Sequence, residues 1–339
     1  MITGAYCMRC KTLLLFGLIL INPGCTDNRI GHEPLQKDEF FTKVDVYQLP
    51  ELYTGGEIMY IEKCSDSLLI VSDFFLRELT IFNVYNNTIT QLGSVGDGPG
   101  EYRHPTFIRN VGNCTIAFSD MTNSNTTMID KNGNHIKTVH HRFGANRKFD
   151  VTNNSIAYLG TGDSLLYIYD LKEDAISSFI EINENYRRLI RHIAGGGIAI
   201  HDNNIYMMNS IEPVIYSFDI TDHSKTKIIP SRWENELRVN FDESRAAQMT
   251  SQRWRDENKQ YAVFIHFDIL NIDNDILLVI FYYRDNQRNI DIIDSSGTII
   301  ASFTTEKYLL GCFDNEMYFY ELHRNDDEFD LFIHRYRTK

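Results

Sequence analysis

The chain has 339 residues, of which 43% are hydrophobic and 23% charged, and this composition is sufficient for a large folded core. The formal net charge is −13 at pH 7, which repels a phosphate backbone and excludes nucleic acid as an expected partner. Phe and Tyr contribute 21 and 19 residues, and this enrichment favours strands over helices.

Residues 1–24 have the features of a signal peptide. Arg9 and Lys11 give a positively charged start, and the nine residues from Leu13 to Ile21 are apolar. A membrane-spanning helix needs about 18 apolar residues, so this run is too short to stay in a bilayer as a helix. The segment therefore predicts an exported protein.

The end of this segment, Asn22 to Cys25 (NPGC), resembles the lipobox of bacterial lipoproteins. In that family the Cys is lipid-modified and becomes the mature N-terminus, and a Leu usually stands where this chain has Asn22. The resemblance implies lipidation of Cys25, a tether over 25–42, and an outer-membrane lipoprotein that faces the periplasm. A plain secretory signal cut near Gly24 is the alternative.

Residues 43–339 contain a repeated unit of apolar strands. In each copy an apolar strand and a short polar gap precede a second strand, and Asn or Asp usually follows that strand where the chain turns. The copies cover 68–93, 115–139, 155–180, 204–229, 275–303 and 316–339. The residues in this turn position are Asn83, Asp130, Asp170, Asp219 and Asp294.

The spacing of these turn residues predicts the fold. Intervals of 47, 40 and 49 residues separate the first four of them, and a four-stranded propeller blade occupies about 40–50 residues. The sequence therefore predicts an all-β, six-bladed β-propeller. The last copy lacks an outer strand, so we expect residues 43–49 to complete the last blade and remove an exposed sheet edge.

The segment between the first two copies carries a family resemblance. Gly93 to Tyr102 (GSVGDGPGEY) is similar to the linker of NHL-type propellers and to the G-x-G-P-G-E-[FY] signature of six-bladed, TolB-like propeller lipoproteins. The resemblance implies this architecture and says little about activity. We expect Tyr102 to pack between two blades, Pro105 to begin the next inner strand, and Glu101 to have a structural role rather than bind a ligand.

An interval of 75 residues separates Asp219 from Asp294, which indicates an insertion at 231–262 between blades 4 and 5. Residues 242–259 lack Gly and Pro and are rich in helix-forming residues, so they predict a short helix. Trp and Arg dominate binding hot spots. The candidate ligand-binding or partner-binding residues are therefore Trp233, Arg253, Trp254 and Arg255. The alternative is that Trp254 anchors the helix to the ring.

No catalytic residue, metal site or cofactor is predicted. After Cys25 the chain has Cys64, Cys114 and Cys312, an odd number without metal-ligand spacing, so we expect small buried thiols. Asp73 and Asp120 are the best candidates for carboxylates that face the central channel, although a role in turns is the expected one.

These features favour a monomeric binding or scaffolding module at the cell envelope, which would recognise a peptide, a protein or a glycan and would not be an enzyme. A propeller hydrolase or lyase with a divalent metal in its central channel is the alternative, because such sites are built from scattered residues that local motifs do not reveal.

Overall fold

In the computed structural model, the residues whose structure is described are 34–49, 58–73, 75–140, 145–160, 162–182, 196–209, 214–228, 230, 233, 263–272, 275–284, 287–305, 313–314, 318–324 and 331–339. All of them belong to one compact unit, Pro34–Lys339. The signal peptide, Cys25 and Cys312 lie outside these residues. Within them, no helix is long and apolar enough to cross a membrane.

The strands pair into six four-stranded antiparallel sheets and one two-stranded parallel sheet. Five of the four-stranded sheets each consist of four strands that are consecutive in the chain, and we number them blades 1 to 5. Blade 1 contains β2 (Ile58–Ser65), β3 (Leu68–Asp73), β4 (Glu78–Asn83) and β5 (Thr88–Gln91). Blade 2 contains β8 (Pro105–Gly112), β9 (Thr115–Asp120), β10 (Asn125–Ile129) and β11 (His135–His140).

The next three blades repeat this order. Blade 3 contains β12 (Ala145–Val151), β13 (Ser155–Gly160), β14 (Ser164–Asp170) and β15 (Ala175–Glu181). Blade 4 contains β16 (Gly197–His201), β17 (Asn204–Met208), β18 (Ile215–Asp219) and β19 (Lys225–Ile228). Blade 5 contains β20 (Val263–Ile272), β21 (Asp275–Arg284), β22 (Gln287–Asp294) and β23 (Ile299–Thr305).

The remaining four-stranded sheet is composite, because it joins the two ends of the unit. Its strands are β24 (Phe313–Asp314), β25 (Tyr318–Arg324), β26 (Leu331–Thr338) and β1 (Phe41–Gln48). β1 pairs antiparallel with β26, from Phe41 opposite Thr338 to Gln48 opposite Phe332. The predicted addition of an N-terminal strand to the last repeat is thereby confirmed.

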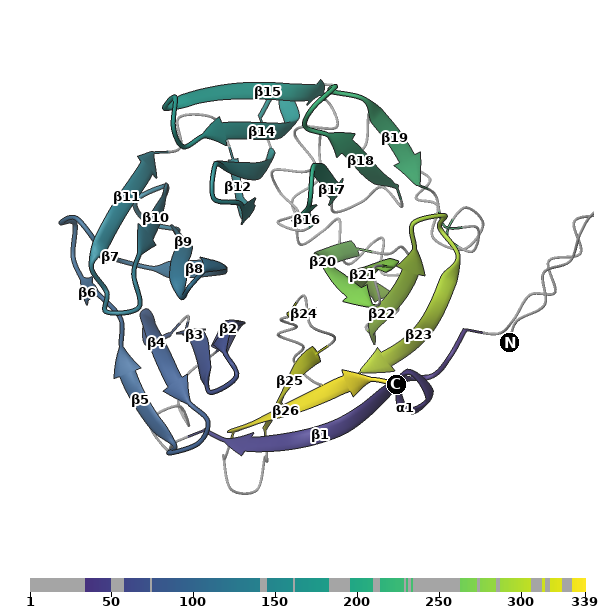
Figure 1. The fold of residues 1–339 in the computed structure, drawn as a ribbon, viewed down its shortest axis with the longest axis horizontal. Coiled ribbons are helices and arrows are strands. Elements are labelled where there is room, and N and C mark those ends of the chain that lie inside the picture. Colours follow the sequence, from purple (N-terminus) through teal and green to yellow (C-terminus); the bar gives the residue numbers. More distant parts are fainter. Residues whose placement is uncertain are drawn as a thin grey trace, which may run out of the picture. The chain divides into compact units, whose positions relative to one another are not determined.

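The sheets surround a common axis, with the first strand of each blade innermost (Figure 1). Six buried apolar clusters fill the interfaces between neighbouring sheets, including the two interfaces of the composite sheet. A strand that is buried on both faces can contact two neighbours at once, which explains the continuous apolar runs of the repeat. The predicted all-β propeller is confirmed.

The turn residues of the repeat act as predicted. The Oδ1 atom of Asp130 accepts hydrogen bonds from the backbone N–H groups of Asn132 at 2.8 Å and Asn134 at 2.9 Å. Equivalent bonds from backbone N–H groups to the side-chain oxygen occur at the other four positions, Asn83, Asp170, Asp219 and Asp294. These bonds close each turn into the outer strand of the blade.

The chain before β1 packs against blade 5. Leu35 forms a parallel bridge with Ala301 on β23, and its N–H donates to the carbonyl of Ile300 at 3.0 Å. The four-residue helix α1 (Lys37–Phe40) follows and buries Phe40. The compact unit therefore begins at Pro34, within the segment that the sequence assigned to the tether.

The linker after blade 1 forms the two-stranded sheet of β6 (Ser94–Val95) and β7 (Glu101–Tyr102). The side chain of Tyr102 is fully buried, and its hydroxyl donates to the carbonyl of Leu92 at 2.8 Å and accepts from the N–H of Leu79 at 3.2 Å. Its ring packs edge-on against Phe118 of blade 2. Tyr102 thus joins two blades, as predicted, and β8 begins at Pro105.

The expectation of free buried thiols is wrong for two cysteines. Cys64 on β2 and Cys114 in the turn before β9 form a disulfide, with their Cα atoms 4.9 Å apart. Fifty residues separate them in sequence, and they meet because the fold places the inner strands of blades 1 and 2 side by side. The bond covalently joins these two blades.

We predict that replacing both cysteines, Cys64→Ser with Cys114→Ser, lowers the free energy of unfolding by about 4 kcal/mol, because a cross-link over some 50 residues restricts the unfolded chain. Urea unfolding followed by tryptophan fluorescence measures this loss. The oxidised natural chain should lose the same amount when a reductant is added, and the variant should not respond to it. Equal stabilities of the oxidised natural chain and the variant would contradict the prediction.

Candidate functional site

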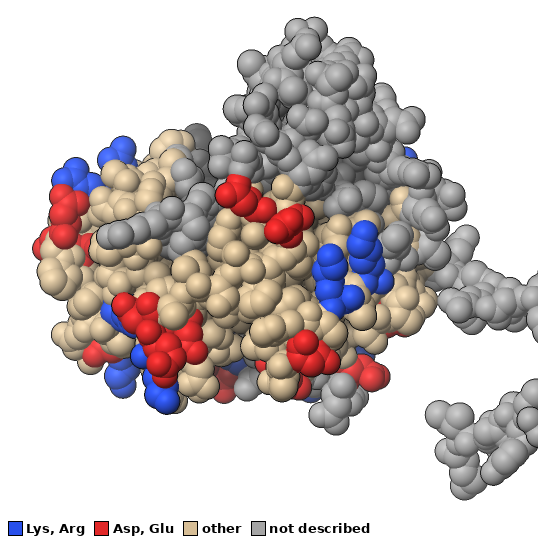
Figure 2. All heavy atoms as spheres, turned by 90° about the horizontal axis from the view of Figure 1, so that it is seen from above, with Lys and Arg blue, Asp and Glu red and all other residues tan. Residues whose placement is uncertain are grey.

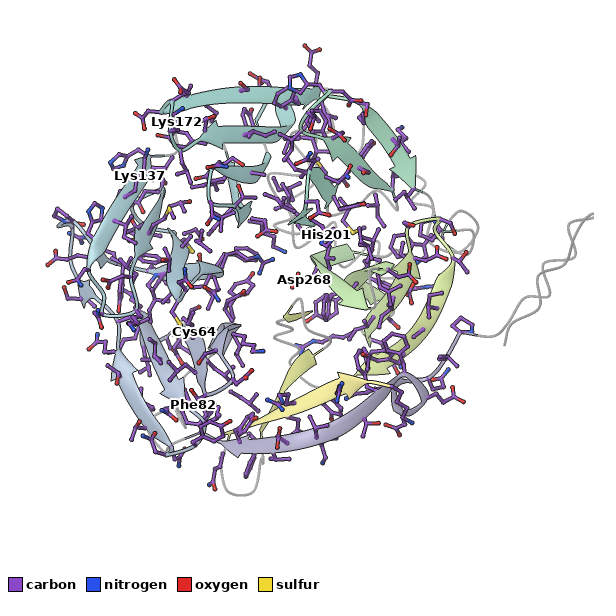
Figure 3. All side chains as sticks on the ribbon, in the orientation of Figure 1. Cys64, Phe82, Lys137, Lys172, His201 and Asp268 are labelled. Carbon is purple, nitrogen blue, oxygen red and sulfur yellow. A yellow bond between two sulfur atoms is a disulfide. The ribbon has the colours of Figure 1, made fainter. Side chains whose placement is uncertain are left out.

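The inner strands bring together a group of charged side chains that we call the inner-strand cluster. It consists of Glu62 on β2, Arg109 on β8, Lys148 and Asp150 on β12, and Asp268 on β20. Arg109, Lys148 and Asp268 are each less than a tenth exposed. Figure 3 shows Asp268 on the side of blade 5 that faces the axis of the ring.

Arg109 is the centre of the cluster. Its Nη1 atom lies 3.6 Å from Oε2 of Glu62, and its Nε atom lies 3.3 Å from Oδ1 of Asp150. The guanidinium also lies over the ring of Phe107, 4.5 Å from the ring centroid. One side chain from blade 2 therefore pairs with carboxylates from blades 1 and 3.

Blade 3 continues these contacts to blade 4. The Nζ atom of Lys148 donates to the carbonyl oxygen of Gly196 at 2.6 Å, and Oδ2 of Asp150 accepts from the N–H of Ile200 at 2.6 Å. Polar contacts close to the axis thus link four consecutive blades. Apart from these contacts, apolar clusters fill the same interfaces.

Burial shifts the protonation of the cluster. It raises the pKa of Glu62 to about 8, with the nearby Asp268 carboxylate adding to the shift and Arg109 opposing it. Burial also raises the pKa of Asp150, again opposed by Arg109. The pKa of Lys148 is lowered to about 7 by burial and by the positive charge of Arg109. Near neutral pH the cluster therefore holds an acid and an amine that can each gain or lose a proton.

The four residues predicted to bind a ligand are only partly described. Trp233 is fully buried, and its Nε1 atom donates to Oδ2 of Asp291 at 2.6 Å, while the hydroxyl of Tyr282 lies 3.2 Å from the same oxygen. This tryptophan therefore belongs to the core between blades 4 and 5. Arg253, Trp254 and Arg255 lie outside the described residues, as does the predicted helix at 242–259.

The carboxylates that the sequence singled out have structural roles. Oδ1 of Asp73 accepts from the N–H of Leu76 at 2.7 Å. Asp120 accepts from the backbone N–H groups of Arg103 at 2.7 Å and Thr122 at 2.9 Å, so it holds both the linker and the turn after β9. The expected role of these residues in turns is confirmed.

Glu101 is also structural. Its Oε2 atom accepts from the N–H of Gly98 at 2.7 Å. A Cβ atom added at Gly96 would lie 2.1 Å from the same oxygen, so a larger residue there would displace the carboxylate from this position. The spacing of Gly and Glu in the linker signature therefore reflects how the loop closes on itself.

Sequence reasoning missed the inner-strand cluster, because its members are dispersed over more than 200 residues and form no local motif. One signal was present. The tripeptides Phe149-Asp150-Val151 and Phe267-Asp268-Ile269 match in type and occur in two inner strands. In both, Oδ1 of the Asp accepts from the next N–H, at 2.9 Å in the first and 3.0 Å in the second.

Comparison with known proteins supports the fold alone. The sequence matches the profile of no described protein family. It also matches no curated protein sequence. In structure, the chain is similar to a candidate exported protein from Bacteroides fragilis, with a TM-score of 0.62, 13% identity, and 91% of this chain and 98% of that one covered.

Two further solved structures share the architecture. A member of the DUF4221 family from Bacteroides vulgatus has a TM-score of 0.57 and 11% identity, with 89% of this chain and 99% of that one covered. Virginiamycin B lyase from Staphylococcus aureus has a TM-score of 0.51 and 12% identity, with 88% and 99% covered. Identities this low show a shared β-propeller fold and transfer no activity.

Among the described residues, no group of three or more His, Cys, Asp or Glu side chains is arranged to hold a metal ion. The carboxyl, amine and guanidinium groups of the cluster can exchange protons and form charge-assisted hydrogen bonds.

We predict that Glu62→Gln changes how stability depends on pH. The carboxyl group titrates near 4.5 in the unfolded chain and near 8 in the folded one, so the folded state binds more protons between these values and loses stability as pH rises through them. The amide that replaces the carboxyl group in the variant does not titrate. The stability of the variant relative to the natural chain should therefore increase by about 3.5 kcal/mol from pH 5 to pH 8.

Urea unfolding at the two pH values measures this difference. Glu173→Gln is the matched control, because Glu173 lies exposed in the turn after β14. The control should follow the pH profile of the natural chain. A constant difference between Glu62→Gln and the natural chain across this range would contradict the raised pKa.

Proposed function

We propose that this protein is an exported, lipid-anchored β-propeller that serves as a binding module at the cell envelope. The composite sheet acts as the sixth blade and closes the ring. The ligand is a peptide, protein or glycan that presents an amine or guanidinium group to the inner-strand cluster, and the insertion at 231–262 contributes further contacts.

The observation that carries this proposal is the buried charge at the axis. Placing ionisable groups in a protein interior costs free energy unless they are paired, and such groups with shifted pKa values mark functional sites more often than other positions. The Arg109 guanidinium pairs with the carboxylates of Glu62 and Asp150, and the Asp268 carboxylate is close enough to Glu62 to help raise its pKa. Lys148 loses its proton near pH 7 and Glu62 loses its proton near pH 8, so above these values the cluster becomes more negative and favours a cationic ligand.

Two other features support export and closure. Disulfides persist in oxidising compartments and are rare in the cytosol, which agrees with the Cys64–Cys114 bond in an exported chain. Apolar clusters on both sides of the composite sheet, one with blade 5 and one with blade 1, support its role as a sixth blade.

A display library of peptides selected against the mature protein tests the binding role. We expect the selected peptides to be rich in Lys and Arg, to bind about tenfold more weakly to Asp268→Asn, and to bind more tightly at pH 8.5 than at pH 6.5, because Glu62 ionises in this range. Exposed Asp66→Asn in the turn after β2 is the matched control and should leave binding unchanged. Selection of no peptide, or equal loss in both variants, would refute the site.

Metal analysis separates this function from the alternative of a metal-dependent hydrolase or lyase. The binding role predicts that the purified mature protein needs no ion, so peptide affinity should be unchanged after dialysis against a chelator. A stoichiometric divalent ion whose removal abolishes the affinity would favour the alternative.

For the anchor, we predict that Cys25→Ser releases the protein from membranes. The sulfur atom of Cys25 would carry the lipid. The hydroxyl group of serine cannot replace the thiol in that reaction. Fractionation of cells that produce each form, followed by immunoblotting, measures the shift from the membrane to the soluble fraction. Equal membrane association of the two forms would show that Cys25 is not the anchor.

A further inference from the structure

Lys148 is buried in the inner-strand cluster without a carboxylate partner. Its side chain is 8% exposed, and its Nζ atom donates to the carbonyl oxygen of Gly196 at 2.6 Å. Across the described part of the chain this is the one hydrogen bond of the amine, and no ion pair accompanies it. The nearby carboxylate of Asp150 is bonded instead to Arg109 and to the N–H of Ile200. Burying an ammonium group in this way costs free energy, because a neutral carbonyl does not balance its charge.

Lys137 shows the ordinary arrangement. Its Nζ atom also donates to a backbone carbonyl, that of Leu171 at 2.8 Å, but it lies 3.1 Å from Oδ1 of Asp174 as well. Figure 3 shows Lys137 near the rim of the ring. Figure 2, which views the side of the ring that carries β15 and β19, shows Lys and Arg side chains at the outer surface. Lys148 therefore has the same kind of neutral partner as Lys137, without the carboxylate and with little access to solvent.

The backbone holds the amine in a defined place. Gly196 has a φ of +78°, and a Cβ atom added there would lie 2.4 Å from the carbonyl oxygen of Met208, so a side chain would displace the carbonyl that Lys148 contacts. Asp150, two residues along β12, also contacts blade 4. Lys148 and Asp150 thus reach the same neighbouring blade, and both lie close to the charge of Arg109.

This environment favours the uncharged amine. Burial and the positive charge of Arg109 lower the pKa of Lys148 to about 7. An uncharged amine has two N–H groups and one lone pair, and the bond to Gly196 uses an N–H. The lone pair is then available for reaction. Lysine amines that are desolvated, or that lie beside another cation, are the ones that act as nucleophiles toward carbonyl compounds.

We propose that Lys148 is a covalent binding site for a small aldehyde. The Nζ lone pair attacks the carbonyl carbon and forms a carbon–nitrogen bond. The carbonyl oxygen then leaves as water with the two hydrogen atoms of the amine, and an imine remains. The step needs no oxidant or reductant. A small uncharged ligand suits this position, because the charges beside it, those of Arg109 and Asp150, already pair with each other.

The imine is independent of the proposed cationic ligand at the axis. Its formation requires the amine of Lys148 and none of the carboxylates that would bind a cation. The two inferences can therefore fail separately, and the experiment below contains no peptide.

Reductive trapping tests the proposal. The mature protein is treated with acetaldehyde and sodium cyanoborohydride at pH 7, which converts an imine into a stable N-ethyl lysine, and peptide mapping by mass spectrometry locates the label. About half of Lys148 is uncharged at this pH, against fewer than about one in a thousand molecules of an ordinary lysine. We expect Lys148 to be labelled at least tenfold faster than Lys137.

The pH dependence of the labelling gives a second readout, which a purely structural role would not produce. From pH 6 to pH 8 the rate at Lys148 should rise about tenfold and begin to level off, whereas ordinary exposed lysines should show a rise of about a hundredfold. In urea, where the chain is unfolded and burial is lost, Lys148 and Lys137 should be labelled at the same rate.

Two variants assign the signal. Lys148→Met retains an unbranched side chain of similar length without the amine, and it should lose the rapid labelling of one lysine per chain. Lys137→Met is the matched control, because it removes a lysine with the same kind of backbone partner. It should leave the labelling of Lys148 unchanged. The measurements on the natural chain remain decisive if Lys148→Met does not fold.

Two results would overturn the proposal: no label at Lys148 in the folded natural chain, or labelling of Lys148 no faster than that of Lys137. Loss of peptide binding at the axis without either result would refute only the proposed function.

Discussion

The pairing of β1 with β26 is the contact on which the ring depends. Every other four-stranded sheet is continuous in the chain, so only this pairing converts an open row of sheets into a closed one. It removes the edge that β26 would otherwise expose. It also completes the apolar interfaces with blades 5 and 1, where Phe41 and Ile333 are buried. The inner strands reach their final positions around the axis only after this closure has formed.

Closure gives positions near the axis and positions farther out different physical characters. Near the axis the inner strands converge, and charged side chains can reach two neighbouring blades, as Arg109 does with Glu62 and Asp150. Farther out the blades diverge, and one small residue, Ser217, is enough to open a groove. Buried charge is therefore concentrated near the axis, and space between blades is found farther out.

The sequence predicted those parts of the fold that repeat. The turn Asn and Asp residues and the apolar strands recur in each copy, so their roles could be inferred from the local sequence. Tyr102 follows a family signature, and its packing between two blades could be inferred in the same way. The disulfide and the inner-strand cluster could not, because Cys64 meets Cys114, and Glu62 meets Arg109, only through the lateral packing of separate blades.

The composite sheet also has a consequence for the order of folding. β1 and β26 lie at opposite ends of the compact unit, so β1 has no strand partner until β26 has been synthesised. During that time β1 is an unpaired strand with exposed Val44 and Val46, which other chains could capture. Cys64 and Cys114 emerge much earlier and can lock blades 1 and 2 together while synthesis continues. The disulfide would then hold blades 1 and 2 together before β26 pairs with β1.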